Sequence, residues 1–376
     1  MIYLDYAASS APYPEVLSHI RSVASEAFGN PGALHCAGAQ ARQILQNSRF
    51  VLAEKLNVRP EEIFFTSGGT ESNNWAIRIG CSGSSRKHIV CSAAEHSSVL
   101  EPLRLLQKKG YFVTFLPPNQ EGYLSPAAVE AALRPDTGLL CVQAVNNETG
   151  VLQDVDALSQ IAHRHRIPYF CDAVQSFGHV SQNLHNADLI SLSAHKFGGP
   201  RGVGCLVVRQ PLVPSPMLLG GGQELGCRSG TENIPGIAGF ALAAERSCQK
   251  LQEEASRVEL LCRQLEDMLL SVCPDLEIAG KGMPRSSILC CRFPGIAAEE
   301  MVSRLDLRGI CVSPGAACAA RSHSPSHVLL SMGYTPLEAA EFVRFSPGWS
   351  TSAAEICQTA EAVAEIIKGK RGSHGK

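Results

Sequence analysis

The sequence has no apolar run that approaches the ~18 residues a membrane-spanning helix needs. Residues 1–6 also lack the basic region and the long apolar run that open a secretory signal peptide. Neither sign of charge is in clear excess, because the formal net charge is −2. The chain therefore has no basic field for nucleic acid, and we expect a protein that binds neither nucleic acid nor membrane.

Metal-binding patterns are missing as well, since the sequence has no Cys-x-x-Cys pair and no His-x-Glu signature. We therefore expect no metal site. The fifteen cysteines would indicate a disulfide framework only in a small secreted chain. Cysteines such as Cys91, Cys141, Cys171 and Cys205 instead stand singly within apolar segments. We interpret them as small buried hydrophobic residues of a cytoplasmic protein.

What the chain does have is length and apolar content. Its 376 residues, 45% of them hydrophobic, are enough for a large core and two domains. From about residue 60 to 210, short apolar segments alternate with helical stretches, which predicts an α/β fold with a mostly parallel sheet covered by helices. The expected strands are 62–66, 87–91, 111–116, 138–143, 167–172, 189–193 and 204–209.

The pattern changes after residue 233, where apolar residues recur at helical spacing as far as residue 272. We interpret this stretch as a long helical connection to a second domain. That domain is expected to contain a strand at 287–293, a helix at 298–307 and a terminal helix near 354–367.

One apolar strand pattern ends in Ser193, His195 and Lys196, directly before a Gly-Gly-Pro sequence. Polar groups at strand ends of such sheets face the ligand crevice. A lysine there can form a Schiff base with a carbonyl cofactor, as pyridoxal 5′-phosphate requires. Asp172 ends another apolar strand and can serve as the acid under a pyridine nitrogen. Taken singly, Lys196 and Asp172 are also compatible with ordinary capping residues of loops.

Further polar groups follow other strands. The glycines of residues 66–73 connect a strand to a helix, a combination that binds phosphate. His96 can stack on an aromatic cofactor, and Asn147 and Gln175 can hydrogen-bond to it. A lone histidine after a strand is more often structural, and the two amides are also compatible with simple turn chemistry. Their convergence at one edge of a parallel sheet is the stronger argument.

The motifs, in this order, closely resemble those of pyridoxal-phosphate-dependent cysteine desulfurases of the NifS and IscS type, within the class V aminotransferase superfamily. The resemblance extends from Tyr3 to Ser346. It implies a fold-type I transferase, with a large domain built on a mostly parallel seven-stranded sheet and a smaller α+β domain. The segments that carry it are 67–72, 95–96, 146–150, 172–176, 193–196, 220–224 and 228–231.

The resemblance also implies roles for individual residues. Lys196 would hold the cofactor and move the Cα proton, while Asp172 would keep the pyridine nitrogen protonated. Gln175 and Asn147 would lie at the phenolic oxygen, and His96 would stack on the ring as a catalytic residue. The phosphate would be bound by Gly69, Thr70, Ser193 and His195.

Substrate and subunit contacts are implied in the same way. Arg344 would form a bidentate pair with the carboxylate of L-cysteine, assisted by Asn30. Thr231 would reach the phosphate of the other subunit, which implies a homodimer. Cys318 would be the nucleophile that takes the sulfur as a persulfide. It lies in a segment rich in small and polar residues, as suits a reactive thiol.

The sequence departs from the family in three respects. Cys318 is flanked by alanines where typical members have serines. Cys36 is a possible second reactive thiol, although we expect it to be buried and inert. The chain also ends soon after the last expected helix, which makes docking of an iron–sulfur scaffold protein less certain.

We therefore predict a cytoplasmic cysteine desulfurase that passes its persulfide sulfur to an acceptor protein of unknown identity, for iron–sulfur cluster assembly, cofactor synthesis or tRNA thiolation. The large domain is expected at 14–248 and the small domain at 1–13 and 249–376. Two alternatives stay open. One is a different reaction on the same fold, such as that of a selenocysteine lyase or an aminotransferase. The other is a non-catalytic adaptor that binds partners.

Overall fold

The computed structural model describes residues 1–82, 85–315 and 325–373. Its centre is a seven-stranded sheet with the strand order β2-β8-β7-β6-β5-β3-β4. Neighbouring strands pair in parallel, except that β8 is antiparallel to β2 and β7. This confirms the expected mostly parallel sheet. The strands are β2 (Ile63–Thr66), β3 (His88–Ser92), β4 (Phe112–Leu116), β5 (Thr137–Cys141), β6 (Tyr169–Asp172), β7 (Leu189–Ser193) and β8 (Gly204–Val208).

Most of these strands are buried on both faces, which is why their sequences are continuously apolar. Alternate residues point to opposite faces. Phe64 and Leu139 pack with α3 (Gly69–Gly80) and α4 (Ser97–Lys108), whereas Phe65 and Leu140 pack in the cluster on the other face. That second face is covered by α1 (Pro14–Glu26), α2 (Cys36–Leu56), α5 (Pro126–Ala132), α6 (Val155–Arg164) and α7 (Ile234–Gln249).

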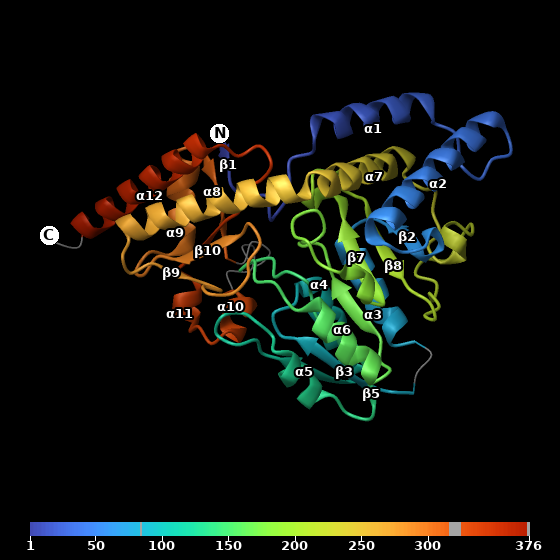
Figure 1. Ribbon diagram of the computed structural model, residues 1–376, viewed down its shortest axis with the longest axis horizontal. Coiled ribbons are helices and arrows are strands. Elements are labelled where there is room, and N and C mark those ends of the chain that lie inside the picture. Colours follow the sequence, from blue (N-terminus) through green and yellow to red (C-terminus); the bar gives the residue numbers. More distant parts are fainter. Residues whose placement is uncertain (83–84, 316–324, 374–376) are drawn as a thin grey trace.

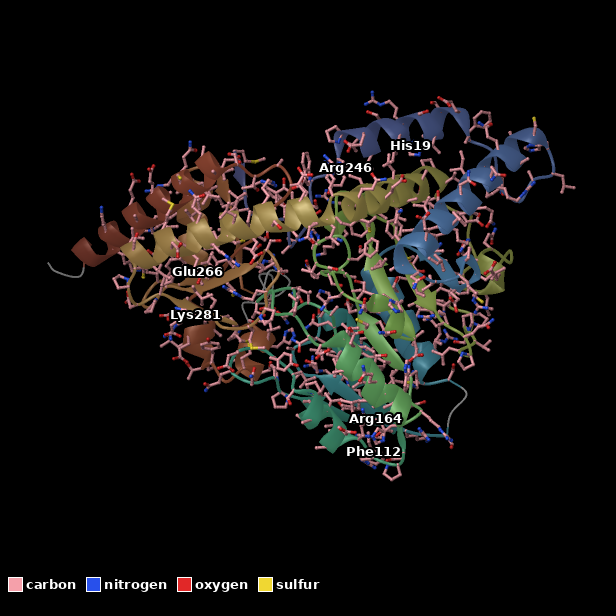
Figure 2. The ribbon with its side chains drawn as sticks, viewed as in Figure 1. His19, Phe112, Arg164, Arg246, Glu266 and Lys281 are labelled. Atoms are coloured by element: carbon pink, nitrogen blue, oxygen red, sulfur yellow. The ribbon has the colours of Figure 1, made fainter. Side chains whose placement is uncertain are left out.

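The expected long helical connection is confirmed as two helices placed end to end, α7 and α8 (Leu251–Val272), which meet at Lys250 (Figure 1). α7 packs against α1 and α2, and α8 packs against α12 (Ala353–Ser373). Figure 2 labels Arg246 on α7 and Glu266 on α8. Arg246 pairs with Glu15 of α1 at 2.6 Å, and Glu266 pairs with Arg285 at 2.9 Å. The two helices therefore contact both halves of the molecule.

The C-terminal half is built on a four-stranded antiparallel sheet with the order β12-β13-β10-β9. A parallel pair, β1 with β11, joins the N-terminus to this half, and Leu4 belongs to its hydrophobic cluster. These contacts support the expected domain boundaries, which stay a prediction. The elements are β1 (Ile2–Tyr3), β9 (Glu277–Ile278), β10 (Leu289–Arg292), α9 (Ala298–Asp306), β11 (Ile310–Cys311), β12 (Ser313–Pro314), α10 (His327–Ser331), α11 (Pro336–Ala339) and β13 (Phe342–Phe345).

Short 3-10 helices complete the chain, and one of them carries Lys196. They are η1 (Pro60–Glu62), η2 (Leu184–Asn186), η3 (Ala194–Lys196) and η4 (Glu224–Gly226). Within the described residues, no helix combines the length and the apolar character that crossing a membrane requires.

Candidate functional site

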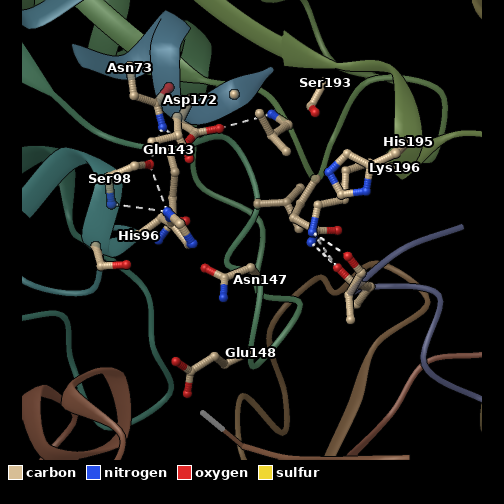
Figure 3. Close-up of a pocket in the computed structure, with 18 of the residues that line it drawn as sticks. Asn73, His96, Ser98, Gln143, Asn147, Glu148, Asp172, Ser193, His195 and Lys196 are labelled. Atoms are coloured by element: carbon tan, nitrogen blue, oxygen red, sulfur yellow. Dashed lines mark hydrogen bonds between the residues drawn. The ribbon is translucent and has the colours of Figure 1, made fainter. Parts of the chain in front are cut away.

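A cavity of about 650 Å³ lies at the edge of the large sheet where the parallel strands end (Figure 3). Parallel strands deliver the residues after their carboxyl ends to one edge, so segments far apart in the sequence meet there. Residues of β13 and of the segment after β1 close the other side. The predicted site residues that line the cavity are Gly69, Thr70, His96, Asn147, Asp172, Gln175, Ser193, His195, Lys196 and Arg344.

The predicted phosphate loop lies between β2 and α3. Helix α3 begins at Gly69, and its N-cap residue, Gly68, has no side chain that could cap the first turn. Gly68 has a φ of 151°, a conformation that residues with side chains rarely adopt. The first N–H groups of α3 are therefore available to an anion, next to the hydroxyl groups of Thr70 and Ser193.

Asp172 lies at the end of β6 and is 7% exposed. Its Oδ2 accepts a hydrogen bond from Asn73 Nδ2 at 2.7 Å, and its Oδ1 accepts one from the Val174 N–H at 3.0 Å. These two donors hold the carboxylate in one orientation at the wall of the cavity.

Lys196 ends η3 and reaches across to the segment after β1. Its Nζ donates to the carbonyl oxygens of Ala7 at 2.7 Å and Ala8 at 3.2 Å. The side-chain amide of Gln175 donates to the same Ala7 oxygen at 2.7 Å. The N-terminal segment is therefore part of the site, which the sequence analysis did not anticipate.

Among the described residues, three histidines line the cavity, and burial lowers the pKa of each of them: His96, His195 and His327. Burial, with the charges of Lys196 and Arg201, lowers the pKa of His195 to about 4. His195 is therefore neutral at pH 7 and carries one ring N–H, and its Nδ1 lies 3.3 Å from Ser9 Oγ.

Arg344 lies on β13 and is only 2% exposed. Its Nη2 donates to Asp5 Oδ1 at 2.8 Å and its Nη1 to the Asn147 carbonyl oxygen at 2.8 Å. The Nε of Arg344 and the side-chain Oδ1 of Asn147 are buried without a hydrogen-bond partner among the described residues. Unpaired buried polar atoms beside a cavity indicate a ligand that supplies their partners.

Eleven further described residues line the cavity that the sequence analysis did not select, and the polar ones among them include Asn73, Ser98, Gln143, Glu148 and His327. Asn73 lies one helical turn after Thr70, and Ser98 lies two residues after His96, so local spacing could have identified both. Glu148 is 4% exposed and contacts the Ser326 hydroxyl. Burial raises its pKa to about 7, although Ser326 and Arg344 both lower it.

Two predicted residues that the structure describes, Asn30 and Thr231, are not among those that line this cavity. Asn30 is exposed, and its Oδ1 accepts from the Gly32 N–H at 2.9 Å. Thr231 is also exposed. Cys318 lies outside the described residues. The roles of all three stay predictions.

The expectation that Cys36 is buried is wrong, because Cys36 is exposed at the first position of α2. Leu34 and His35, which precede it, are exposed too. This end of α2 therefore lies at the surface, away from the hydrophobic core. By contrast, Cys91, Cys141, Cys171 and Cys205 are all fully buried in strands, as expected.

Comparisons with known proteins extend over almost the whole chain. Residues 2–358 match the family described as Aminotransferase class-V. The chain is 37% identical to "Cysteine desulfurase IscS" of Dictyoglomus turgidum over 383 residues, which cover 98% of this chain and 95% of that protein.

Solved structures agree with this similarity. One described as "NIFS-LIKE PROTEIN" superimposes with a TM-score of 0.90 at 32% identity, covering 98% of this chain and 99% of the other. Another, "SspA in complex with cysteine", superimposes with a TM-score of 0.79 at 33% identity, covering 93% and 99%.

Proposed function

Since this chain belongs to the class-V aminotransferase family, we propose that it is a pyridoxal-phosphate-dependent cysteine desulfurase. It converts L-cysteine to L-alanine and retains the sulfur as a persulfide on Cys318. The observation that carries this function is the convergence of Lys196, Asp172 and Arg344 in one cavity. These are the groups needed to hold the cofactor, to tune its ring and to bind an amino-acid carboxylate.

The residues present fit pyridoxal phosphate. Its phosphate needs several donors, and the cavity offers the start of α3 beside Thr70, Ser193 and His195. Its pyridine N–H needs an acceptor, which the oriented carboxylate of Asp172 provides. When bound, the cofactor supplies an electron sink for the charge that develops at the Cα of the amino acid.

The residues of the chain then have distinct tasks. Lys196 would hold the cofactor through Nζ and would carry the Cα proton of the substrate. The buried guanidinium of Arg344, with an unpaired Nε, binds the substrate carboxylate. His96 lines the same cavity as Asp172 and would contact the cofactor ring.

The sulfur step belongs to Cys318. Its thiolate attacks the sulfur of the bound cysteine, so that a new S–S bond forms while the C–S bond of the substrate breaks. The carbon that loses sulfur gains a proton, and the products are L-alanine and the Cys318 persulfide. No external oxidant or reductant is needed, because the electron pair of the broken C–S bond stays with the carbon, which is then protonated.

This function is favoured over its alternatives. An aminotransferase requires a keto-acid acceptor, whereas the reaction above does not. A non-catalytic adaptor has no need of both Lys196 and Cys318, which the chain retains. Selenocysteine is a closely related substrate, and measuring alanine formation with L-selenocysteine in place of L-cysteine compares the two.

The working unit is proposed to be a homodimer. Apolar side chains are exposed in two segments of the large half, where Phe28 is 80%, Leu34 is 99% and Leu219 is 86% exposed. Exposed apolar groups of this kind are typical of protein interfaces. Thr231 is exposed near the second of these segments, as a residue reaching a partner's phosphate would be.

The proposed location is the cytoplasm, with an acceptor protein for the sulfur. The fourteen described cysteines are thiols and not members of disulfides, which suits a reducing compartment. A persulfide is a carrier rather than an end product, so an acceptor must remove its sulfur. Iron–sulfur cluster assembly, cofactor synthesis and tRNA thiolation are the pathways we propose for that acceptor.

The test uses purified protein and L-cysteine without any keto acid. Alanine is expected to form, with sulfide released in equal amount when a thiol reductant is present. Mass spectrometry without reductant should find one added sulfur atom on the Cys318 peptide. Cys318→Ala should form no persulfide, whereas Cys36→Ala, which removes another exposed thiol, should behave as the wild type. Alanine formation that survives Cys318→Ala in full would refute this assignment.

A further inference from the structure

A continuous chain of hydrogen bonds connects His96 to Asp172 through two residues that are not assigned a role above. His96 Nδ1 lies 2.7 Å from Ser98 Oγ. Asn73 Nδ2 donates to Ser98 Oγ at 2.8 Å and to Asp172 Oδ2 at 2.7 Å. Figure 3 shows these four residues on one side of the cavity, opposite Lys196. They come from α3, the start of α4 and the end of β6.

The chemistry of the groups determines which atom donates and which accepts in each of these hydrogen bonds. An ionised carboxylate only accepts, so the NH₂ group of Asn73 must face Asp172. The same NH₂ group has a second hydrogen, which it gives to Ser98 Oγ. Since Ser98 Oγ accepts from Asn73, its own hydrogen is directed to His96 Nδ1. The Ser98 backbone N–H also donates to Nδ1, at 3.1 Å.

His96 Nδ1 is therefore an acceptor of two hydrogen bonds and carries no proton. A neutral imidazole must then bear its hydrogen on Nε2. Burial strengthens this selection: Asn73 is 1%, Ser98 is 8% and Asp172 is 7% exposed, so water does not replace these contacts. Protonation of Nδ1 would oppose two donors at once, which acts in the same direction as the burial that lowers the pKa of His96.

We propose that Asn73 and Ser98 are positioning residues that hold His96 as the Nε2–H tautomer and couple its ring to the orientation of the Asp172 carboxylate. The proposal rests on the proposed function, because it concerns the two groups that would contact the cofactor from this wall. His96 thus meets its ligands as a hydrogen-bond donor through Nε2, and Asn73 is the link that both groups share.

The test compares Ser98→Ala, Asn73→Ala and the control Asn74→Ala in the cofactor-loaded protein. Asn74 is the same residue type on the same helix, but it is half-buried, and its side-chain amide donates to backbone carbonyl oxygens, that of Thr70 at 2.9 Å and that of Ser98 at 3.5 Å, and not to the side chains of the network. Two readouts are used. Proton–nitrogen spectra of protein with ¹⁵N-labelled histidine report the tautomer of His96, and steady-state kinetics separate kcat from KM.

Ser98→Ala is expected to give His96 signals of mixed tautomers and a kcat lower by roughly 10- to 100-fold, with a smaller change in KM. Asn73→Ala should give the same changes and also weaken cofactor binding. Ser98→Thr, which keeps the hydroxyl group, should restore the single tautomer, and Asn74→Ala should match the wild type.

A wild-type His96 that is protonated on Nδ1, or an unchanged tautomer and kcat in Ser98→Ala, would overturn the proposal. If Asn73→Ala fails to fold, the pair Ser98→Ala and Ser98→Thr decides the question alone. The tautomer readout does not depend on the substrate. A wild-type protein that shows the Nε2–H tautomer but does not consume cysteine would contradict only the proposed function.

Discussion

Arg344 and Asp5 form an ion pair across the two ends of the chain, with Nη2 of Arg344 2.8 Å from Oδ1 of Asp5. The pairing exists because the segment after β1 runs beside β13, where Asp5 and Ser346 are bridged. Asp5 and the Asn147 carbonyl oxygen engage Nη2 and Nη1, while Nε remains buried and unpaired among the described residues. The guanidinium is thus oriented before any substrate arrives.

We predict that Arg344→Ala raises the KM for cysteine by at least tenfold, because a buried substrate carboxylate that loses its charged partner costs about 2–5 kcal/mol. Asp5→Asn should raise KM less, since it only loosens the guanidinium. Steady-state kinetics check both. Arg292→Lys, on the neighbouring strand β10, is the control and should leave KM unchanged. Equal KM values for Arg344→Ala and the wild type would show that the carboxylate is bound elsewhere.

The second prediction concerns Lys196, whose Nζ is held by the Ala7 and Ala8 carbonyl oxygens beside the phosphate loop. The purified protein should be yellow, and borohydride reduction should fix the cofactor to the peptide that contains Lys196. Lys196→Ala should abolish this adduct. A matched control is Lys281→Ala, at an exposed position in the other half of the molecule. Adduct formation on another lysine in Lys196→Ala would place the attachment site elsewhere.

Glu148 predicts a specific dependence of stability on pH. Burial raises its pKa from 4.5 to about 7 in the folded protein. The folded state then binds the proton more tightly than the unfolded state. The stabilising contribution of protonated Glu148 to the free energy of unfolding is therefore fully present below pH 4.5 and is lost as pH rises to about 7. A pKa shift of this size corresponds to about 3 kcal/mol in the free energy of unfolding.

Glutamine cannot ionise. The free energy of unfolding of Glu148→Gln should therefore rise relative to that of the wild type as the pH increases from 4.5 to 7. Denaturant titrations at several pH values measure this difference. Glu61→Gln, at an exposed position, should follow the wild type throughout. Parallel curves for Glu148→Gln and the wild type would mean that Glu148 is ionised in the folded protein across this range.

The sequence was informative where a local pattern has one structural solution. Continuous apolar segments such as 137–141 can be buried on both sides only inside a covered parallel sheet, so the strands of the large sheet were predictable, with ends that differ from the observed ones by up to about two residues. Lys196 and Asp172 follow such strands, and their shared location follows from parallel topology alone. This is why so much of the cavity wall was anticipated.

Contacts between distant segments were not predictable in this way. Nothing local to Asp5 or Ala7 indicates that the N-terminus crosses to Arg344 and Lys196, since those contacts depend on the pairing of β1 with β11. Asn73 has the sequence context of an ordinary helix residue, and its role is visible only once β6 brings Asp172 beside it. The burial of Cys36 was inferred from composition, which does not tell a helix start at the surface from one in the core.

The last prediction concerns the dimer. The wild-type protein should sediment at twice its chain mass of 40.2 kDa. Leu34 is 99% exposed in the single chain, so Leu34→Asp should not disturb folding, yet a charge at an interface must be desolvated. We therefore expect the dimer of this variant to dissociate at higher concentration than the wild type. Activity should fall as the dimer dissociates, since Thr231 is proposed to complete the partner's phosphate site.

Leu307→Asp is the matched control, because Leu307 is 84% exposed but follows α9 in the other half of the molecule. It should change neither the sedimentation nor the activity. Sedimentation velocity and cysteine-dependent alanine formation, measured over the same range of concentrations, separate two interpretations. If activity follows the dimer fraction in both proteins, the site needs its partner. A monomer with full activity would contradict the dimer and, with it, the role proposed for Thr231.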